Sequence, residues 1–344
     1  MGRLFYIVMS GDKPDLSLYE IKCFVEGIFG DRCFVEYFNG GLFIYNCNVS
    51  YMDLEAISRL RLSYIKEFGE VLCYRYIDGE VDVGSLYSFL EYSFRELGGF
   101  RIGRIIVEGV DLSIDWVLLK KRYSDYSSDR LVTLIVASGM IAIGRYIASR
   151  DKEQFDKSSR ISVDFRSPGS MNMVDQNFMV NVLYLKSRFS PGNIYDPFMG
   201  TGKLLLRPCL DSYRVVGSDI SVEKSYSSYA RLRRYGCVDM DLVISDSTIM
   251  PFRDGIIDLI MTDLPYGRQS SIRYIDKKTF IARVLDEFSR VLRLGGLALI
   301  AFSHDQLNDV IDYIDRLSNL RVVDIVSEYV HSSLIRIYMM IEKR

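Results

Sequence analysis

Short apolar strands and helices alternate from about residue 171 to the C-terminus, and this alternation constrains the fold more than any other feature. The predicted strands occupy residues 193–196, 215–219, 241–244, 256–262 and 297–302. Such alternation favours a mostly parallel sheet with helices on both faces, since parallel neighbours need a crossover between them. Two further strands, at residues 321–329 and 335–341, predict an antiparallel hairpin at one edge. The predicted fold class is therefore α/β.

A glycine-rich turn follows the first of these strands and precedes a helix. Residues 196–202 read D-P-F-M-G-T-G. Glycines let the backbone turn sharply and approach a ligand closely. The run matches neither the phosphate-binding pattern G-x-x-x-x-G-K-[ST] nor the dinucleotide pattern G-x-G-x-x-G. A purely structural turn is the alternative to the cofactor site that we predict here, formed by Asp196, Pro197, Phe198, Gly200, Thr201 and Gly202.

Carboxylates also stand at the ends of the next two strands. Asp219 comes about 20 residues after the glycine-rich turn, where a carboxylate can accept hydrogen bonds from both ribose hydroxyls of an adenosine. Asp246 follows the third strand, where a carboxylate or the adjoining backbone can bond an adenine edge. Capping of a following helix is the alternative for either aspartate. The predicted cofactor contacts in these two places are Asp219, Ile220, Asp246 and Ser247.

A second chemical motif follows the strand at residues 256–262. Residues 262–267 read T-D-L-P-Y-G, which puts an acid, a rigid proline and an aromatic ring at the carboxyl edge of the sheet. Ligands bind at that edge in open α/β sheets. A simple turn would account for the proline and the glycine, but not for Asp263 and Tyr266 on either side of the proline. We predict that the catalytic residues are Asp263, Leu264, Pro265 and Tyr266, with Asp263 also facing the cofactor.

The first 150 residues have a different pattern, typical of small α+β units. Residues 1–60 are predicted to form a strand, a helix, a hairpin and a short helix. Residues 61–150 are predicted to form a second unit, in which residues 116–119 are either a strand or a short helix. Residues 151–170 are rich in charge and are interpreted as a helical linker, which leaves residues 171–344 for the parallel sheet.

The overall charge argues at first against a nucleic-acid partner, because domains that bind nucleic acids usually carry a clear positive excess. The 344 residues have a formal net charge of −2. This charge is unevenly distributed: residues 1–110 carry −5, residues 111–190 carry +3 and residues 191–344 are balanced. A locally basic middle segment is therefore compatible with an RNA partner.

Cysteine and histidine usage excludes several kinds of site. The six cysteines form no C-x-x-C pair and only two histidines are present, which argues against a zinc site and against histidine-based triads. We expect the cysteines to be reduced, buried thiols. No apolar run reaches the roughly 18 residues that a membrane span needs, and the N-terminus lacks a signal-peptide pattern. These features predict a cytoplasmic protein with no metal and no membrane contact.

The motifs D-P-F-M-G-T-G and D-L-P-Y-G, with Asp219 between them, resemble those of class I S-adenosylmethionine-dependent methyltransferases that modify exocyclic amines of bases. Nearly end to end, the chain resembles the THUMP-domain tRNA guanosine-10 N2-methyltransferase family. Two departures stand out, because Leu264 replaces the commoner proline of the acceptor motif [D/N]-P-P-[Y/F], and Arg166 and Ser167 replace an aromatic–histidine pair. The further segments that carry the resemblance are residues 4–11, 16–22, 143–148, 167–171 and 331–336.

The resemblance implies a Rossmann-like class I methyltransferase domain at residues 171–344, a ferredoxin-like unit at residues 1–60 and a THUMP RNA-binding domain at residues 61–150. It implies S-adenosylmethionine as the cofactor, with Ser170 among its contacts, and tRNA as the partner. It also implies a small activating protein partner, as in eukaryotic relatives, and otherwise a monomer. For each basic residue a solvated surface charge is the alternative, and the candidate RNA contacts are Lys120, Lys121, Arg122, Arg145, Arg150, Lys152 and Arg268.

The predicted reaction is methyl transfer to the N2 amine of a guanosine, at position 10 by resemblance, once or twice. Asp263 and the carbonyl of Leu264 would accept hydrogen bonds from the amine and turn its lone pair toward the methyl group. Tyr266 would stack on a base that has left its helical stack. Two alternatives are kept: the same chemistry on another tRNA or rRNA guanosine or on adenine, and a non-catalytic RNA-binding protein that retains the cofactor fold.

Overall fold

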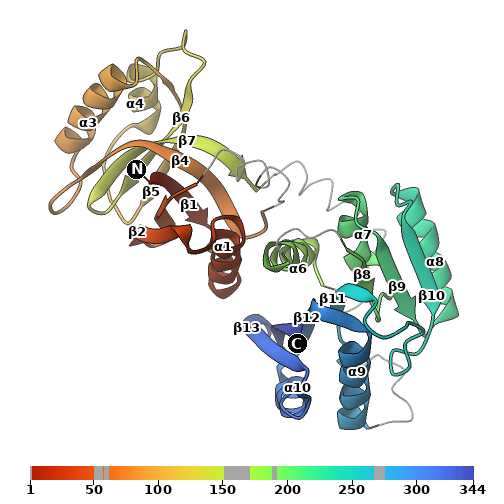
Figure 1. Ribbon diagram of the computed structural model, residues 1–344. Helices are drawn as coiled ribbons and strands as arrows, with labels where there is room; N and C mark the ends of the chain where they lie inside the picture. Colours follow the sequence, from red (N-terminus) through yellow and green to blue (C-terminus); the bar gives the residue numbers. More distant parts are fainter. Residues whose placement is uncertain (1, 50–56, 58–61, 151–170, 188–191, 267–275) are drawn as a thin grey trace. The chain divides into compact units, whose positions relative to one another are not determined.

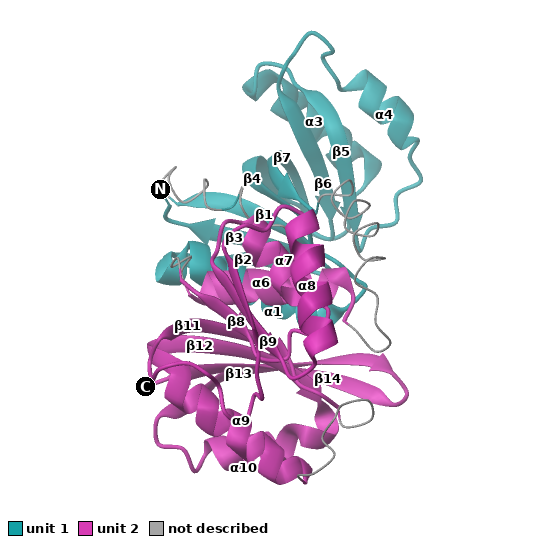
Figure 2. Ribbon diagram, turned by 90° about the vertical axis from the view of Figure 1, so that its right-hand side faces the viewer, with its two compact units in different colours: residues 1–150 teal, residues 151–344 magenta. Residues whose placement is uncertain are grey.

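The chain forms two compact units, Met1–Arg150 and Asp151–Arg344, each with its own seven-stranded sheet (Figures 1 and 2). The computed structural model describes residues 2–49, 57, 62–150, 171–187, 192–266 and 276–344. Among the helices in these ranges, none is both long enough and apolar enough to cross a membrane.

Unit 1 has the strand order β2-β3-β1-β4-β7-β6-β5. Buried side chains of α3 and α4 pack with those of β6 and β7 in one apolar core. The segment predicted as either a strand or a short helix is the start of α4, which Asp115 caps. The elements of unit 1 are β1 (Arg3–Met9), α1 (Pro14–Ile28), η1 (Gly30–Arg32), β2 (Cys33–Asn39), β3 (Leu42–Cys47), β4 (Ile65–Tyr76), α3 (Val83–Glu96), β5 (Arg101–Glu108), α4 (Trp116–Arg122), β6 (Leu131–Ala137) and β7 (Met140–Ser149).

The two units predicted at residues 1–60 and 61–150 share this one sheet. β1 pairs antiparallel with both β3 and β4, and β2 pairs antiparallel with β3. With β4, which lies beyond residue 60, this order and these directions are those of the ferredoxin-like arrangement that the resemblance implies. β4, however, also pairs with β7 over most of its length. The predicted boundary at residue 60 therefore does not separate two sheets.

A buried tyrosine on β1 links strands that belong to both predicted units. The hydroxyl of Tyr6 contacts the side chains of Glu67 (2.7 Å) and Thr133 (3.2 Å), which lie on β4 and β6. Its ring lies against two glycines, Gly69 on β4 and Gly144 on β7. A Cβ atom added at these positions would come within 2.3 Å and 2.4 Å of the ring. The glycines therefore make room for a side chain that joins strands from both predicted units.

Unit 2 has the strand order β10-β9-β8-β11-β12-β14-β13. Strands β8 to β12 are parallel, and β14 is antiparallel to both of its neighbours. The elements of unit 2 are α6 (Met173–Lys186), β8 (Ile194–Asp196), α7 (Lys203–Leu210), β9 (Val215–Asp219), α8 (Val222–Arg234), β10 (Met240–Ile244), β11 (Ile257–Asp263), α9 (Lys277–Val291), β12 (Leu292–Ser303), η2 (His304–Gln306), α10 (Leu307–Ile314), β13 (Leu320–His331) and β14 (Leu334–Lys343).

This architecture confirms the predicted fold class, an α/β domain with a mostly parallel sheet and an antiparallel edge hairpin. Helices α6, α7 and α8 lie on one face of the sheet, and α9 and α10 lie on the other (Figure 2). The strand order reverses between the neighbouring strands β8 and β11: the chain runs outward from β8 to β9 and β10, and then returns to β11 on the other side of β8. Open α/β sheets bind ligands at such a reversal of strand order, outside the carboxyl ends of the strands.

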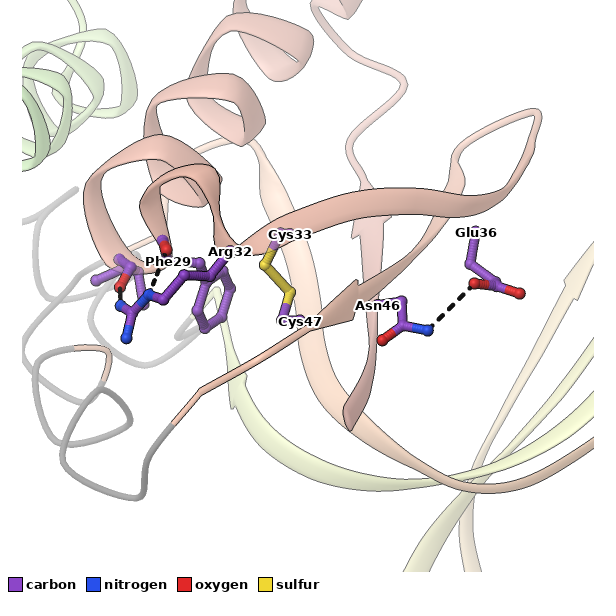
Figure 3. Close-up of a disulfide and its surroundings, with 7 residues drawn as sticks. Phe29, Arg32, Cys33, Glu36, Asn46 and Cys47 are labelled. Carbon is purple, nitrogen blue, oxygen red and sulfur yellow. Dashed lines mark hydrogen bonds between the residues drawn. A yellow bond between two sulfur atoms is a disulfide. The ribbon is translucent and has the colours of Figure 1, made fainter. Parts of the chain in front are cut away.

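The expectation that the cysteines are reduced is wrong for four of them. Cys33 and Cys47 lie directly opposite each other on β2 and β3 and form a disulfide, with their Cα atoms 4.1 Å apart (Figure 3). Cys209 and Cys237 form a second disulfide between the end of α7 and the segment after α8. The partners in the two disulfides are 14 and 28 positions apart and are brought together by strand register and by helix packing. The absence of a C-x-x-C pattern therefore says nothing about them.

Removal of the Cys33–Cys47 disulfide should lower the melting temperature of the protein. The bond joins residues 14 positions apart, and closing a loop of that size in the unfolded chain is worth about 3 kcal/mol. We expect a lower melting temperature for the C33S/C47S variant, and for the wild type in a strong reductant. Cys73→Ser, at a thiol outside both disulfides, is the control. A melting temperature that reductant leaves unchanged would contradict the assignment.

Candidate active site

Acidic side chains gather at one edge of the sheet in unit 2. Strands β8, β9, β10 and β11 are parallel neighbours, so their carboxyl ends share that edge. Asp196, Asp219 and Asp263 are the last residues of β8, β9 and β11, and Asp246 comes two residues after the end of β10. The structure therefore brings four predicted site residues to the edge where the strand order reverses.

The glycine-rich turn between β8 and α7 is held by Asp219. Gly200 and Gly202 have φ angles of 51° and 79°, in the left-handed region that favours glycine. The amide of Gly200 donates to Oδ2 of Asp219 (3.0 Å), and the amide of Ser221 donates to Oδ1 (2.8 Å). Ser221, not Asp219, is the N-cap of α8. The carboxylate of Asp219 thus fixes the turn against the start of the next helix.

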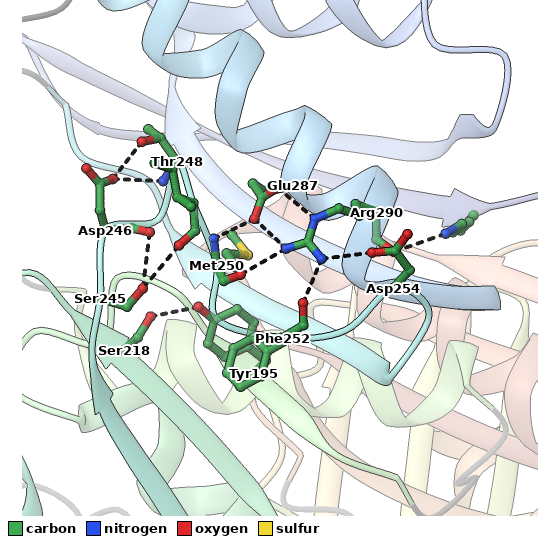
Figure 4. A network of polar contacts seen from close by, with 12 residues as sticks. Tyr195, Ser218, Ser245, Asp246, Thr248, Met250, Phe252, Asp254, Glu287 and Arg290 are labelled. Carbon is green, nitrogen blue, oxygen red and sulfur yellow. Dashed lines mark hydrogen bonds and ion pairs between the residues drawn. The ribbon is translucent and has the colours of Figure 1, made fainter.

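The segment after β10 is anchored to α9 (Figure 4). Arg290 donates to the carbonyl of Met250 (2.9 Å), and Glu287 accepts a hydrogen bond from the amide of the same residue. Within the segment, Oδ1 of Asp246 accepts hydrogen bonds from the amide and the hydroxyl of Thr248, each at 2.8 Å. Asp246 therefore closes a tight turn before β11 and does not cap a helix.

A buried hydrogen bond joins the two motifs across the reversal of strand order. Thr262 on β11 donates its hydroxyl to Oδ1 of Asp196 (2.6 Å), which also accepts from the amide of Phe198 (3.0 Å). Asp196 is only 1% exposed. Burial raises the pKa of Asp196 to about 7, although both hydrogen bonds act in the opposite direction. This carboxyl therefore links the glycine-rich turn to the strand that carries the acceptor motif.

The acceptor motif is a turn held at two backbone positions. The amide of Leu264 donates to the carbonyl of Ala301, which extends the pairing of β11 with β12 (2.8 Å). Gln306, in η2 after β12, donates its side-chain amide to the carbonyl of Pro265 (3.2 Å). Gln306 is buried and was not predicted as a site residue, because its contact with the motif depends on the tertiary fold.

Asp263 and Tyr266 contact each other directly. The hydroxyl of Tyr266 donates to Oδ1 of Asp263 (2.5 Å). Burial raises the pKa of Asp263 to about 6, while the guanidinium of Arg336 and the bond from Tyr266 oppose this rise. Burial also raises the pKa of Tyr266, so its phenol stays protonated and remains a donor. The two side chains expected to act on the substrate are therefore joined by a direct hydrogen bond.

Arg336 on β14 completes this group, and the sequence reasoning gave it no role. Its Nε donates to the hydroxyl oxygen of Tyr266 (3.0 Å), and the residue is only 3% exposed. The signal in the sequence is a lone arginine inside an otherwise apolar run at residues 334–341. Such a residue needs buried partners, because an unpaired cation in the core is costly.

The other predicted cofactor residues lie along the same edge. Pro197 and Ser247 are buried, Thr201 is half-buried, and Phe198 packs against α9. Ile220 is 57% exposed directly after Asp219. Ser170 falls outside the described residues. Within the described ranges, no group of three or more His, Cys, Asp or Glu side chains could hold a metal ion.

The predicted RNA contacts on α4 differ in their surroundings. Lys120 donates to the carbonyl of Gly103 (2.8 Å), which draws it toward the sheet. Lys121 and Arg122 are exposed. The guanidinium of Arg122 lies 5.4 Å from the ring centre of Tyr87 and also contacts the ring of Tyr123. Lys121 and Arg122 are therefore the members of this group that remain accessible to an RNA backbone.

The predicted RNA contacts on and after β7 already have acidic neighbours. Arg145 forms an ion pair with Glu70, and Arg150 lies 3.6 Å from Asp12. Lys152 and Arg268 fall outside the described residues. A phosphate would have to compete with these carboxylates for Arg145 and Arg150.

The raised pKa of Asp196 predicts how stability changes with pH. A carboxyl whose pKa is higher in the folded chain keeps its proton there, so its contribution is complete below about pH 4. That contribution is lost as the pH rises toward about 7. We expect the unfolding free energy to fall over this window by on the order of 2–4 kcal/mol from this group.

The Asp196→Asn variant keeps an accepting oxygen but does not titrate, so its unfolding free energy should depend less on pH. Chemical unfolding followed by circular dichroism across the window measures the difference. Asp312→Asn, at an exposed position of α10, is the control and should leave the slope unchanged. Parallel curves for Asp196→Asn and the wild type would contradict the assignment.

Known proteins resemble this chain in sequence and in fold. No protein family model matches the chain. The chain is 28% identical to a Methanothermobacter thermautotrophicus protein named tRNA (guanine(10)-N2)-dimethyltransferase, over 98% of each chain. A segment is 31% identical to the Bos taurus U6 snRNA (guanine-N(2))-methyltransferase THUMPD2, over 33% of this chain and 22% of the relative. TrmN from Thermus thermophilus, a solved structure, aligns with 99% of this chain and 100% of its own at a TM-score of 0.54 and 14% identity. The chain therefore shares its fold, in both units, with that structure.

Proposed function

We propose that this protein transfers a methyl group from S-adenosylmethionine to the N2 amine of a guanosine in tRNA, at position 10. The observation that carries the proposal is the placement of the glycine-rich turn, Asp219 and Asp263 at the ends of three strands at one sheet edge. The similarity of nearly the whole chain to a relative named for this reaction supports the substrate.

The residues at the ends of β8 and β9 fit the cofactor. Each oxygen of Asp219 accepts one backbone hydrogen bond, and a carboxylate oxygen has a second lone pair that can accept a ribose hydroxyl. A Cβ atom added at Gly200 would have only the carbonyl oxygen of Phe198 within 4 Å, so the backbone there is open to a ligand, whereas a Cβ atom at Gly202 would press on Ser228 and Leu232 of α8 (3.2 Å each). We assign Asp246, Ser247 and Ile220, at the same edge of the sheet, to the adenine. Bound S-adenosylmethionine supplies the methyl group on a positively charged sulfur.

Asp263 and the backbone of Leu264 orient the nucleophile. The exocyclic amine of guanine is a weak nucleophile, because its lone pair is delocalised into the ring. Oδ1 of Asp263 already accepts from Tyr266, so we assign Oδ2 to the amine and the carbonyl of Leu264 to its second hydrogen. These two bonds turn the lone pair toward the methyl group in a near-attack geometry, and Pro265 keeps the backbone in place.

Asp263 also receives the proton that the amine loses on methylation. Transfer of the methyl group leaves the nitrogen with a surplus proton and a positive charge. Burial raises the pKa of Asp263 to about 6, which makes it a better base than an exposed aspartate, while it stays ionised at neutral pH. Since the hydroxyl of Tyr266 is engaged, we assign the face of its ring to the flipped base.

Unit 1 is proposed to bind the tRNA, with residues 61–150 as a THUMP domain. Lys121 and Arg122 are exposed on α4, in the segment whose net charge is positive, and phosphate contacts of this kind fix register rather than read sequence. The small activating partner and the monomeric state stay predictions from the resemblance, and the cytoplasmic location stays a prediction from the sequence.

A second RNA is a candidate substrate because of one comparison. The segment shared with THUMPD2 is 31% identical, and that relative is named for guanine-N2 methylation of U6 snRNA. The chemistry would be the same, and the difference would lie in the RNA that is captured.

Mass spectrometry of nucleosides tests the proposal. The protein is incubated with isotopically labelled S-adenosylmethionine and either tRNA or U6 snRNA, and the labelled nucleoside is identified and mapped to its position. We expect N2-methylguanosine or N2,N2-dimethylguanosine at position 10 of tRNA. Label on another nucleoside, or in U6 snRNA alone, would show that the proposed substrate is wrong. The absence of label from both RNAs would refute the proposed activity.

Substitution of Asp263 should separate catalysis from cofactor binding. Asp263→Ala removes the acceptor for the amine, so the turnover rate should fall by about 100- to 10,000-fold, with the affinity for S-adenosylmethionine retained. Asp263→Asn keeps an accepting oxygen and should retain part of the activity. The wild-type rate should fall below about pH 6, as Asp263 gains a proton, and this fall should be absent in Asp263→Asn. An unchanged rate in Asp263→Ala would show that another group orients the amine.

The double variant Lys121→Ala/Arg122→Ala should weaken tRNA binding and leave the turnover rate at saturating tRNA unchanged. Each lost phosphate contact should lower the slope of log affinity against log salt by about 0.7 to 0.9, as filter binding at several salt concentrations would measure. Arg316→Ala, which removes one exposed positive charge from unit 2, is the control and should leave the slope unchanged. Identical slopes for the double variant and the wild type would remove α4 from the RNA-binding surface.

A further inference from the structure

A buried charged cluster beside the acceptor motif has no part in the proposed chemistry as it stands. Arg336, Glu328 and Asp175 come from β14, β13 and α6, and the side chains of all three are at most 4% exposed. Burying charged groups costs more than their attraction returns unless geometry and hydrogen bonds are favourable, and apolar side chains of similar size often stabilise a core at least as well. Stability alone is therefore a weak reason for this cluster.

The contacts of the cluster lead toward the acceptor motif. Nη1 of Arg336 lies 3.5 Å from Oδ2 of Asp175 and 3.5 Å from Oε2 of Glu328. Tyr338 donates its hydroxyl to Oε2 of Glu328 (2.7 Å). The guanidinium is thus set by acids on two other elements, and its remaining Nε donates to the hydroxyl of Tyr266 (3.0 Å).

We propose that Arg336 is a positioning residue for the methyl acceptor, which holds Tyr266 and through it the carboxylate of Asp263 in the orientation that receives the amine. The inference rests on the proposed function and assigns a task to residues that touch neither the cofactor nor the substrate. Glu328 and Asp175 orient Arg336, and Arg336 orients Tyr266.

The geometry at Tyr266 explains how this works. Its hydroxyl accepts a hydrogen bond from Arg336 and donates its only proton to Oδ1 of Asp263. Because the guanidinium can only donate, the phenol proton is directed toward Asp263. That bond occupies one oxygen of the carboxylate and leaves the other for the amine. Without Arg336, the hydroxyl could turn away and Asp263 would lose the bond that fixes its rotamer.

Charge provides a second link between the cluster and Asp263. The guanidinium of Arg336 lowers the pKa of Asp263 against the larger effect of burial, while Asp175 and Glu328 raise it. Asp196, on the neighbouring strand, also interacts electrostatically with Asp263. Loss of the guanidinium should therefore move the acid side of the pH–rate profile to higher pH, and neutralisation of Glu328 should move it to lower pH.

The test compares five single variants of the full-length chain with tRNA and S-adenosylmethionine. Arg336→Gln removes the cation, Arg336→Lys keeps the charge without the planar fork, Tyr266→Phe removes one hydroxyl, and Glu328→Gln neutralises one acid. Arg321→Gln is the matched control, because Arg321 lies on the same hairpin in an exposed ion pair with Glu342 (2.5 Å). The turnover rate, the Michaelis constants for both substrates, the pH–rate profile and the melting temperature are measured for each.

We expect Arg336→Gln to lower the turnover rate by about 100-fold, since a misplaced group costs on that order, with both Michaelis constants little changed. Arg336→Lys should recover part of the rate. Tyr266→Phe should also lower the turnover rate. The turnover rate of the double variant Arg336→Gln/Tyr266→Phe should be no lower than that of the slower single variant, because both substitutions break the same series of hydrogen bonds from Arg336 to Asp263. The acid limbs of Arg336→Gln and Glu328→Gln should shift in opposite directions, and Arg321→Gln should match the wild type.

A wild-type turnover rate in Arg336→Gln would overturn the inference, and so would a rate loss with no shift of the acid limb, which is what a merely structural role gives. If Arg336→Gln does not fold, the other two variants decide. A wild-type turnover rate in Tyr266→Phe, together with an unshifted acid side of the pH–rate profile in Glu328→Gln, would overturn the inference. An inactive wild type would refute the proposed function and this inference together, whereas an active wild type with normal variants would refute the inference alone.

Discussion

The hydrogen bond from Thr262 to Asp196 is the contact on which the rest of the site depends. It crosses the point where the strand order reverses, so it fixes the end of β8 against the end of β11 (2.6 Å). The glycine-rich turn begins at one of its partners and the acceptor motif begins directly after the other. Methyl transfer requires that donor and acceptor be held within a narrow range of distance and angle, and this bond sets the position of one motif relative to the other.

The aspartates at this edge differ in role because their surroundings differ. Asp196 is buried and accepts hydrogen bonds from Thr262 and Phe198, so it joins β11 to the glycine-rich turn. Asp219 bonds the backbone on both sides of the glycine-rich turn and still has lone pairs for a ligand. Asp263 shares one oxygen with Tyr266, and the opposing effects of burial and Arg336 place its pKa at about 6. One residue type thus joins the two motifs and, in the proposed reaction, also binds the cofactor at Asp219 and the amine at Asp263.

Features encoded locally could be predicted from the sequence. The strands of unit 2 are short apolar runs bounded by turn residues, and Asp219 and Asp263 follow from their place at strand ends. Contacts made by distant segments could not be predicted. Arg336 reaches Tyr266 across 70 residues and Gln306 reaches Pro265 across 41. The disulfide between Cys33 and Cys47 depends on strand register in the same way, and the continuous sheet of unit 1 depends on the pairing of β4 with both β1 and β7.

The proposed reaction requires that the cofactor lie at the ends of β8 and β9 with its methyl group facing Asp263. A crystal structure of the protein with S-adenosylhomocysteine, the product of the cofactor, tests this placement most directly. We expect ribose hydroxyls on the carboxylate of Asp219, the ligand against the turn at Gly200 and Gly202, and the sulfur directed toward Asp263. A ligand bound elsewhere, or one at this edge with its sulfur directed away from Asp263, would contradict this placement.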